Sequence, residues 1–163
     1  MNQEVIILMV EDDIGHANLI KKNLRRAGIE NEIIHFKDGA TVLDFLFQPA
    51  PGDEMECGTP NSEFRIRNGI PYFMLLDLRL PKVDGVEILA RIKSEPELEN
   101  MPVVVITTTD DPQEVAKCRA LGCVLYITKP VDYQKFAEAI VKLGSLISVV
   151  EVPKVNTGGG DRK

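Results

Sequence analysis

Five short apolar runs recur along the chain, and a helical pattern of apolar positions follows each of them. The runs cover residues 5–10, 32–36, 72–76, 102–106 and 124–128. Apolar runs of this length without polar alternation are typical of strands that are buried on both faces of a parallel sheet. The sequence therefore predicts five strands in the interior of the molecule.

The segments between these runs repeat apolar residues every three or four positions, as the buried face of a helix does. In the first segment this face is formed by Ile14, Ala17, Ile20 and Leu24, and Gly28 stands where a left-handed residue would end the helix. Later helices are predicted to begin at Asp38, near Val86, at the cap-like sequence 111–114, and before Phe136. Strands that alternate with helices predict right-handed crossovers and an α/β fold with helices on both faces of the sheet.

This rhythm predicts one domain over residues 1–150. Residues 48–70 interrupt it with prolines, glycines and acidic residues, which indicates a solvent-exposed loop insertion. Residues 151–163, which include three consecutive glycines, are expected to form a flexible C-terminal tail.

Composition narrows the class of protein without deciding it. The chain is 44% hydrophobic and 27% charged, as soluble domains are, and its net charge of −6 disfavours nucleic acid or an anionic membrane as partner. No apolar stretch approaches the roughly 20 residues of a membrane span, and the N-terminus lacks a basic signal-peptide start. We expect a cytoplasmic protein whose three cysteines are free thiols.

Polar side chains with matching chemistry stand at the carboxyl ends of four predicted strands. Glu11 and Asp12 follow the first strand, Asp77 the third, Thr107 the fourth and Lys129 the fifth. Successive crossovers bring these ends to one edge of the sheet, where open α/β sheets bind their ligands.

These residue types together favour phosphoryl chemistry. Three carboxylates in one crevice repel each other unless a cation neutralises them, and an all-oxygen set favours a hard ion such as Mg²⁺, or Mn²⁺. A hydroxyl and an ammonium group suit phosphoryl oxygens, and an aspartate can accept a phosphoryl group as an acyl phosphate. The pattern therefore predicts metal-dependent phosphoryl transfer onto Asp77.

Each residue also has a simpler interpretation. The acids at 11–13 could cap a helix, Thr107 could be an ordinary β-branched strand end, and Lys129 could be a solvated surface charge. One fold brings all of them to a single place, however, and this favours the functional interpretation.

The chain resembles the receiver domain of two-component response regulators, the CheY-like family. The resemblance covers residues 5 to about 147 and rests on four motifs: 10–13 (VEDD), 76–85 (LDLRLPKVDG), 105–108 (VITT) and 126–130 (YITKP). It implies a flavodoxin-like, three-layer α/β/α fold with five parallel strands in the order 2-1-3-4-5. The insertion and the expected lack of an output domain resemble the stand-alone regulators of bacteriophytochromes.

The resemblance also implies roles for individual residues. Asp77 would be the phosphoacceptor, with Thr107 and Lys129 on the phosphoryl group. Glu11, Asp12, Asp77 and the backbone carbonyl of Arg79 would hold the metal. Tyr126 would turn inward with Thr107 as the switch, and the bond before Pro130 would be cis.

The implied partner is a sensor histidine kinase or a phosphotransfer protein. A bacteriophytochrome could be this partner. The fourth helix, fifth strand and fifth helix would carry the signal to another protein or form a homodimer. Such a chain is a signalling protein that catalyses only its own phosphorylation and dephosphorylation.

Some positions depart from the common receiver pattern or lie outside it. Thr108 is bulkier than the small residue common there, and we expect Arg79, Thr108 and Thr109 to tune the lifetime of the phosphoryl group. His16 lies one turn into the first helix, near the acids, where it could be a ligand, but the favoured interpretation is a solvated helix residue. His35 is expected to be structural.

Two other functions fit part of the pattern. A phosphatase of the haloacid-dehalogenase type also forms an aspartyl phosphate, but it needs two aspartates at D-x-D spacing after the first strand, where Glu11 would take the place of the nucleophile. A flavin-binding flavodoxin-like protein needs a Ser-, Thr- and Gly-rich phosphate loop after that strand, where this chain has acids.

Overall fold

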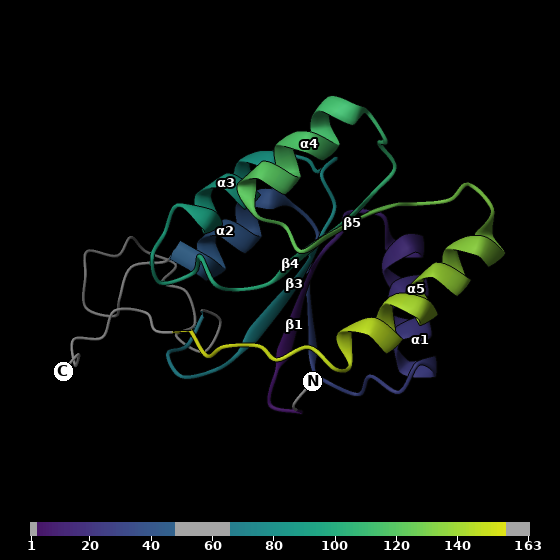
Figure 1. Ribbon diagram of the computed structural model, residues 1–163, viewed down its shortest axis with the longest axis horizontal. Coiled ribbons are helices and arrows are strands. Elements are labelled where there is room, and N and C mark those ends of the chain that lie inside the picture. Colours follow the sequence, from purple (N-terminus) through teal and green to yellow (C-terminus); the bar gives the residue numbers. More distant parts are fainter. Residues whose placement is uncertain (1–2, 48–65, 156–163) are drawn as a thin grey trace.

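Five strands and five helices alternate in the computed structural model, which describes residues 3–47 and 66–155 (Figure 1). The strands are β1 (Ile6–Val10), β2 (Ile33–Phe36), β3 (Tyr72–Leu76), β4 (Val103–Thr107) and β5 (Leu125–Thr128). The helices are α1 (Ile14–Arg26), α2 (Gly39–Phe47), α3 (Gly85–Lys93), α4 (Pro112–Leu121) and α5 (Tyr133–Ile147). Each apolar run of the sequence therefore forms one strand.

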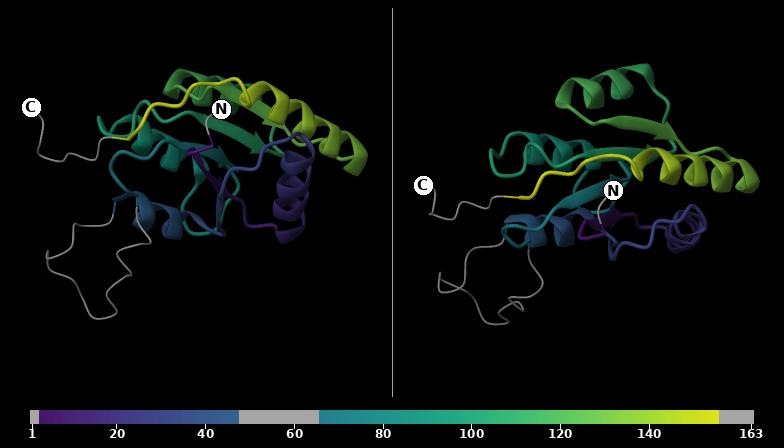
Figure 2. Two further views of the ribbon diagram at one scale, coloured as in Figure 1. Left: turned by 90° about the horizontal axis from the view of Figure 1, so that it is seen from below. Right: turned by 60° about the horizontal axis from the view of Figure 1, so that its bottom comes forward.

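The strands form one parallel sheet in the order β2-β1-β3-β4-β5. Helices α1 and α5 cover one face, and α2, α3 and α4 cover the other (Figures 1 and 2). This is the flavodoxin-like, three-layer α/β/α architecture that the sequence predicts, including its strand order.

Two apolar cores explain why the strands lack polar alternation. Successive strand residues point to opposite faces, so Leu8 and Met74 pack beneath α2 and α3, while Ile7 and Phe73 pack beneath α1 and α5. Both faces of β1, β3 and β4 are buried.

Aspartates begin all five described helices just beyond the carboxyl edge of the sheet. The side chains of Asp13, Asp38, Asp84, Asp111 and Asp132 each accept a hydrogen bond from a backbone N–H in the first turn of their helix. The start of each of these helices is thereby fixed close to the strand end that precedes it.

The described parts of the expected loop and tail, residues 66–70 and 151–155, are hydrogen-bonded to the domain. Ile66 is buried, and its backbone N–H donates to the carbonyl of Phe45. Val155 is 6% exposed; its N–H donates to the carbonyl of Ile70, and its own carbonyl accepts from Gly69. Residues 151–155 therefore return along the start of β3 instead of extending away from it, whereas 48–65 and 156–163 lie outside the described residues.

The peptide bond between Lys129 and Pro130 is trans, so the expected cis bond is wrong. Trans is the lower-energy form even before proline. Within the described parts of the chain, no helix has the length and apolar character needed to cross a bilayer.

Candidate functional site

Three carboxylates meet at the carboxyl edge of the sheet. Glu11 and Asp12 follow β1 and Asp77 follows β3, and one oxygen from each lies within 4.8 Å of the others. Glu11 and Asp77 are buried, at 1% and 6% exposure, while Asp12 is exposed. Such an all-oxygen set, open on one side, suits a hard divalent cation that keeps part of its water shell.

Lys129 lies between the two buried carboxylates. Its Nζ is 2.7 Å from Glu11 Oε1 and 3.0 Å from Asp77 Oδ2, and its side chain is 3% exposed. The remaining Asp77 oxygen, Oδ1, accepts the backbone N–H of Arg79 at 3.1 Å. The ammonium group therefore supplies positive charge to two carboxylates that have little access to water.

The pKa of Glu11 shows that the charges of the site are not balanced. Burial, reinforced by the charge of Asp77, raises the pKa of Glu11 to about 7, although the hydrogen bond from Lys129 opposes the rise. One ammonium therefore does not fully compensate the two carboxylates, and an additional cation at this place would stabilise their ionised forms.

Thr107 ends β4, between the strands that lead to Asp77 and Lys129. It is fully buried, and none of the described residues forms a hydrogen bond with its Oγ1. A buried hydroxyl without a protein partner is unusual, and a ligand atom or an ordered water can supply the missing bond.

Tyr126 and the residues after Thr107 form a second layer around the site. The hydroxyl of Tyr126 donates to the carbonyl of Thr109 at 2.8 Å, and burial raises the pKa of Tyr126 to about 12. Thr109 is buried and Thr108 exposed. The loop after β4 is thus linked directly to β5.

The side chains of Arg79 and Thr109 have different partners. The Arg79 guanidinium lies 4.0 Å from Glu114 in the first turn of α4, whereas the Thr109 hydroxyl accepts the N–H of Asp111. The tuning of the phosphoryl lifetime that we expected of Arg79 and Thr109 stays a prediction.

Glycine is required close to Asp77 for steric reasons. A Cβ on Gly85 would lie 2.5 Å from the backbone carbonyl oxygen of Asp77 and 2.5 Å from Cα of Leu78. The start of α3 packs against the backbone that carries the central carboxylate, so it helps to fix its position.

Both histidines of the chain contact residues of the site. The contact of His16 was not expected of a solvated helix residue, whereas the contact of His35 is consistent with the expected structural role. His16 Nδ1 is 3.0 Å from Lys129 Nζ and 3.8 Å from Glu11 Oε2. His35 Nε2 is 2.7 Å from the backbone carbonyl of Glu11. For His16 the only sequence signal was its place one turn after the acids; for His35 it was its place at the carboxyl end of an edge strand.

Comparison with known proteins agrees with this geometry. The model of the response regulator receiver domain matches residues 64–141. Response regulator Rcp1 of Synechocystis sp. is 36% identical over 128 residues, which are 78% of this chain and 78% of Rcp1. The chain belongs to the response regulator receiver family.

Solved structures of receivers have the same fold. A receiver domain from Rhodospirillum rubrum is 46% identical, with a TM-score of 0.79 over 93% of this chain and 99% of its own. The Mn²⁺-bound form of Rcp1 has a TM-score of 0.73 at 31% identity, over 91% and 98% of the two chains. Bacteriophytochrome response regulator RtBRR has a TM-score of 0.60 at 37% identity, over 85% and 77%. This receiver is therefore a two-component signalling domain with an acidic cluster suited to a divalent metal.

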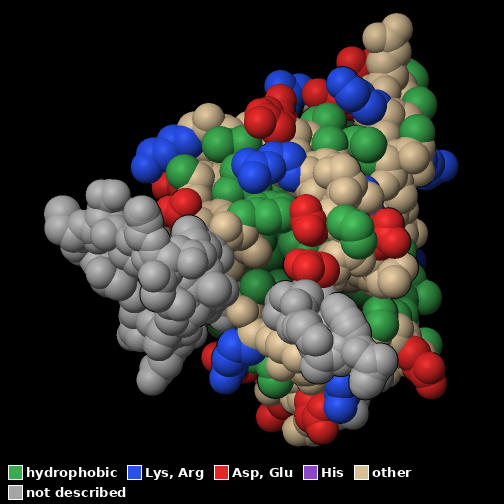
Figure 3. Space-filling view, turned by 90° about the vertical axis from the view of Figure 1, so that its left-hand side faces the viewer, with side chains coloured by type: hydrophobic (Ala, Val, Ile, Leu, Met, Phe, Trp, Pro, Cys, Tyr) green, Lys and Arg blue, Asp and Glu red, His purple; other side chains and the backbone are tan. Residues whose placement is uncertain are grey.

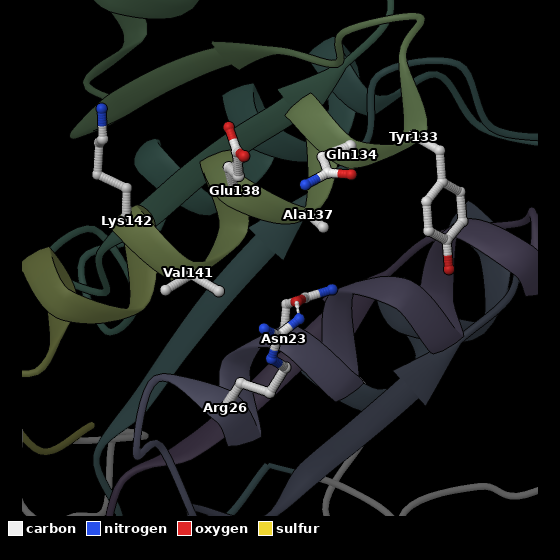
Figure 4. A pocket seen from close by; sticks show the side chains of 8 residues that line it. All are labelled: Asn23, Arg26, Tyr133, Gln134, Ala137, Glu138, Val141 and Lys142. Atoms are coloured by element: carbon white, nitrogen blue, oxygen red, sulfur yellow. Dashed lines mark hydrogen bonds between the residues drawn. The ribbon is translucent and has the colours of Figure 1, made fainter.

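The receiver has further surface features away from this cluster. A groove of about 570 Å³ lies between α1 and α5, and Asn23, Arg26, Tyr133 and Lys142 are among its lining residues (Figure 4). On the face shown in Figure 3, acidic, basic and apolar side chains of the described residues are interspersed.

Proposed function

We propose that this receiver accepts a phosphoryl group on Asp77 from a phosphohistidine of a histidine kinase or phosphotransfer protein. The observation that carries the proposal is Thr107 Oγ1, which is buried and has no hydrogen-bond partner among the described residues, beside the strands that lead to Asp77 and Lys129. An Asp77 oxygen attacks phosphorus, the phosphorus–nitrogen bond breaks, and the donor imidazole leaves with its electron pair and takes up a proton.

The surrounding residues have separate tasks in this reaction. Lys129 and Thr107 would hold phosphoryl oxygens, Lys129 through its charge and Thr107 through its hydroxyl. Glu11, Asp12, Asp77 and the backbone carbonyl of Arg79 would hold Mg²⁺ or Mn²⁺. When bound, this ion neutralises the carboxylates and the phosphoryl oxygens.

Mass spectrometry of the intact protein tests the acceptor. With Mg²⁺ and acetyl phosphate, the wild type should gain one phosphoryl group, and Asp77→Asn should gain none. Asp44→Asn, which alters an exposed aspartate of α2, is the matched control and should react like the wild type. Labelling of Asp77→Asn to the wild-type level would refute the assignment, and multiple-turnover hydrolysis of varied phosphate esters would favour the phosphatase.

A second comparison isolates the Thr107 hydroxyl. Thr107→Val keeps the shape of the side chain but removes the oxygen, whereas Thr107→Ser keeps the oxygen. We expect the valine variant to react more slowly than the serine variant, because only serine can donate to a phosphoryl oxygen. Equal rates in the two variants would exclude this role.

The proposed output surface consists of α4, β5 and α5. Cys118 is the one buried residue of α4, and β5 is only partly covered. Thr107 and Tyr126 would shift together on phosphorylation and alter this surface, either for a partner protein or for a homodimer. Sedimentation with and without acetyl phosphate tests the homodimer, because a phosphorylation-dependent increase in mass is expected.

The proposed kinase partner could be a bacteriophytochrome, because RtBRR, a bacteriophytochrome response regulator by name, is 37% identical to this chain over the aligned residues. We also propose a cytoplasmic location, where such a kinase domain would be met. Phosphotransfer from purified candidate kinases, measured against Asp77→Asn, would identify the donor.

Arg79, Thr108 and Thr109 are proposed to set the phosphoryl lifetime. The backbone N–H of Arg79 donates to Asp77, and the exposed Thr108 directly follows Thr107, so both side chains would be close enough to restrict the approach of water. Decay of phospho-Asp77 in Arg79→Ala, Thr108→Ala and Thr109→Ala would measure each effect, and unchanged half-lives in all three would exclude it.

A further inference from the structure

The ammonium group of Lys129 has three N–H donors, and three acceptors surround it. Glu11 Oε1 lies at 2.7 Å, Asp77 Oδ2 at 3.0 Å and His16 Nδ1 at 3.0 Å. Because an ammonium group can only donate, Nδ1 of His16 must carry a lone pair, which places the ring proton on Nε2. His16 thus completes the coordination of a buried charge.

The three acceptors differ in what the proposed reaction asks of them. Asp77 becomes bonded to phosphorus and loses its negative charge, and Glu11 turns to the metal. His16 has neither task. It is therefore the one of the three acceptors that can keep its bond to Lys129 while the other two change partners.

The position of the imidazole is fixed from two sides. The backbone N–H of His16 donates to Asp13 Oδ1 at 3.0 Å, which holds the first turn of α1. The ring meets the buried ring of Phe136 in α5 edge to face, at a centroid distance of 5.5 Å. An acceptor held in this way can in turn hold a flexible lysine side chain.

We propose that His16 is a positioning residue that anchors Lys129 and directs its ammonium group to the phosphoryl oxygens during phosphorylation of Asp77. The inference rests on the proposed function. Without this anchor, Lys129 keeps only the two carboxylates as partners and is drawn toward them, away from the incoming phosphoryl group.

Two substitutions distinguish the role of His16 as a hydrogen-bond acceptor from the role of its aromatic ring. His16→Phe keeps an aromatic ring against Phe136 but removes the acceptor. His16→Asn loses the ring but can place its side-chain oxygen close to the position of Nδ1. Asn18→Phe, at an exposed position of the same helix, is the matched control for a new aromatic ring on α1.

The first measurement is the rate at which phospho-Asp77 forms with acetyl phosphate and Mg²⁺ as the donor concentration is varied. His16→Phe should lower the maximal rate about tenfold, the effect of one hydrogen bond to a charged group, with the half-saturating donor concentration unchanged. His16→Asn and Asn18→Phe should stay within about threefold of the wild type by the same scale.

The second measurement needs neither metal nor donor. In lysine-selective ¹H–¹⁵N spectra of the metal-free protein, the ammonium protons of Lys129 should exchange slowly with water in the wild type and in His16→Asn. They should exchange faster in His16→Phe, in which one of the three acceptors is lost.

Three results would overturn the proposal: an unchanged rate in His16→Phe, an equal loss in His16→Asn, or an equal loss in Asn18→Phe. The first removes the acceptor role, the second assigns the effect to the ring, and the third assigns it to α1 as a whole. Failure of the wild type to form any adduct on Asp77 would instead refute the proposed function itself.

Discussion

Replacing Lys129 with methionine should destabilise the metal-free receiver and make its stability depend on Mg²⁺. Methionine fills most of the volume of lysine without the charge, so the change leaves Glu11 and Asp77 as neighbouring buried carboxylates with no cation. Lys129 Nζ lies 2.7 Å and 3.0 Å from these groups, whose side chains are 2% and 7% exposed. Removing one partner from such a buried ionic contact costs about 3–5 kcal/mol.

The loss should lie near the lower end of that range, since Glu11 can take up a proton. Its pKa is already raised to about 7, and it should rise further without Lys129, so protonation relieves part of the repulsion. At pH 8 we expect a loss of about 3 kcal/mol, equivalent to a fall in Tm of roughly 6–12 °C for a domain of this size.

Mg²⁺ should reverse this loss. In the wild type the ion competes with Lys129 for the carboxylates of Glu11 and Asp77, whereas in Lys129→Met it does not. A concentration about 100 times the dissociation constant stabilises the folded state by about 2.7 kcal/mol. The increase in Tm caused by a given Mg²⁺ concentration should therefore be larger in Lys129→Met than in the wild type.

Urea unfolding at pH 8, with EDTA or with Mg²⁺, measures both effects, and Lys117→Met on the exposed side of α4 is the matched control. The reasoning is refuted if metal-free Lys129→Met is as stable as the control, because the carboxylates would then need no cation. It is equally refuted if Mg²⁺ stabilises both variants to the same extent.

Three further predictions concern stability. Between pH 4.5 and about 7 the folded state binds more protons at Glu11 than the unfolded state does. The free energy of unfolding of the metal-free protein should therefore fall as pH rises, by at most about 1.4 kcal/mol per pH unit. An equal slope in Glu11→Gln would contradict this. Gly85→Ala places a Cβ 2.5 Å from the carbonyl oxygen of Asp77. It should lower the free energy of unfolding by about 1–3 kcal/mol and slow phosphorylation. Wild-type values in urea unfolding and in labelling would exclude the clash. Val155→Ala should lower the free energy of unfolding by about 1–2 kcal/mol because this valine is 6% exposed. The control Val149→Ala, at a position that is 79% exposed, should lower it by almost nothing. Equal losses would show that residues 151–155 do not anchor to the domain.

The sequence was sufficient to predict the fold, because the two cores alternate along single strands. Leu8 and Met9 are neighbours in the chain but belong to different cores, so the strand reads as continuously apolar. Such runs between amphipathic helices leave few topologies, and the strand order followed from the family resemblance. The strand-end position of Asp77 could be predicted in the same way, since its place depends only on where a buried strand stops.

Contacts that depend on the direction of side chains could not be predicted from the sequence. His16 and Lys129 are 113 positions apart, and whether they meet depends on the rotation of α1 and on its distance from the end of β5. The return of Val155 to the start of β3 likewise depends on the course of the chain after α5. Neither has a local pattern, since one polar residue on a helix or one valine near a glycine-rich end fits many arrangements.

The charges of the site suggest how phosphorylation would be sensed. Counted as ionised, Glu11, Asp12 and Asp77 together with Lys129 carry a net charge of −2, which a divalent cation would neutralise. In the proposed reaction the carboxylate of Asp77 becomes a neutral acyl group, while the phosphoryl group brings about −2. The charge of the site therefore changes by only about one unit, and the field of such a change at the surface is screened within about 10 Å. The signal must then depend mainly on which hydrogen bonds the phosphoryl oxygens gain. In the proposed reaction, the buried hydroxyl of Thr107 and the ammonium group of Lys129 would donate two of them.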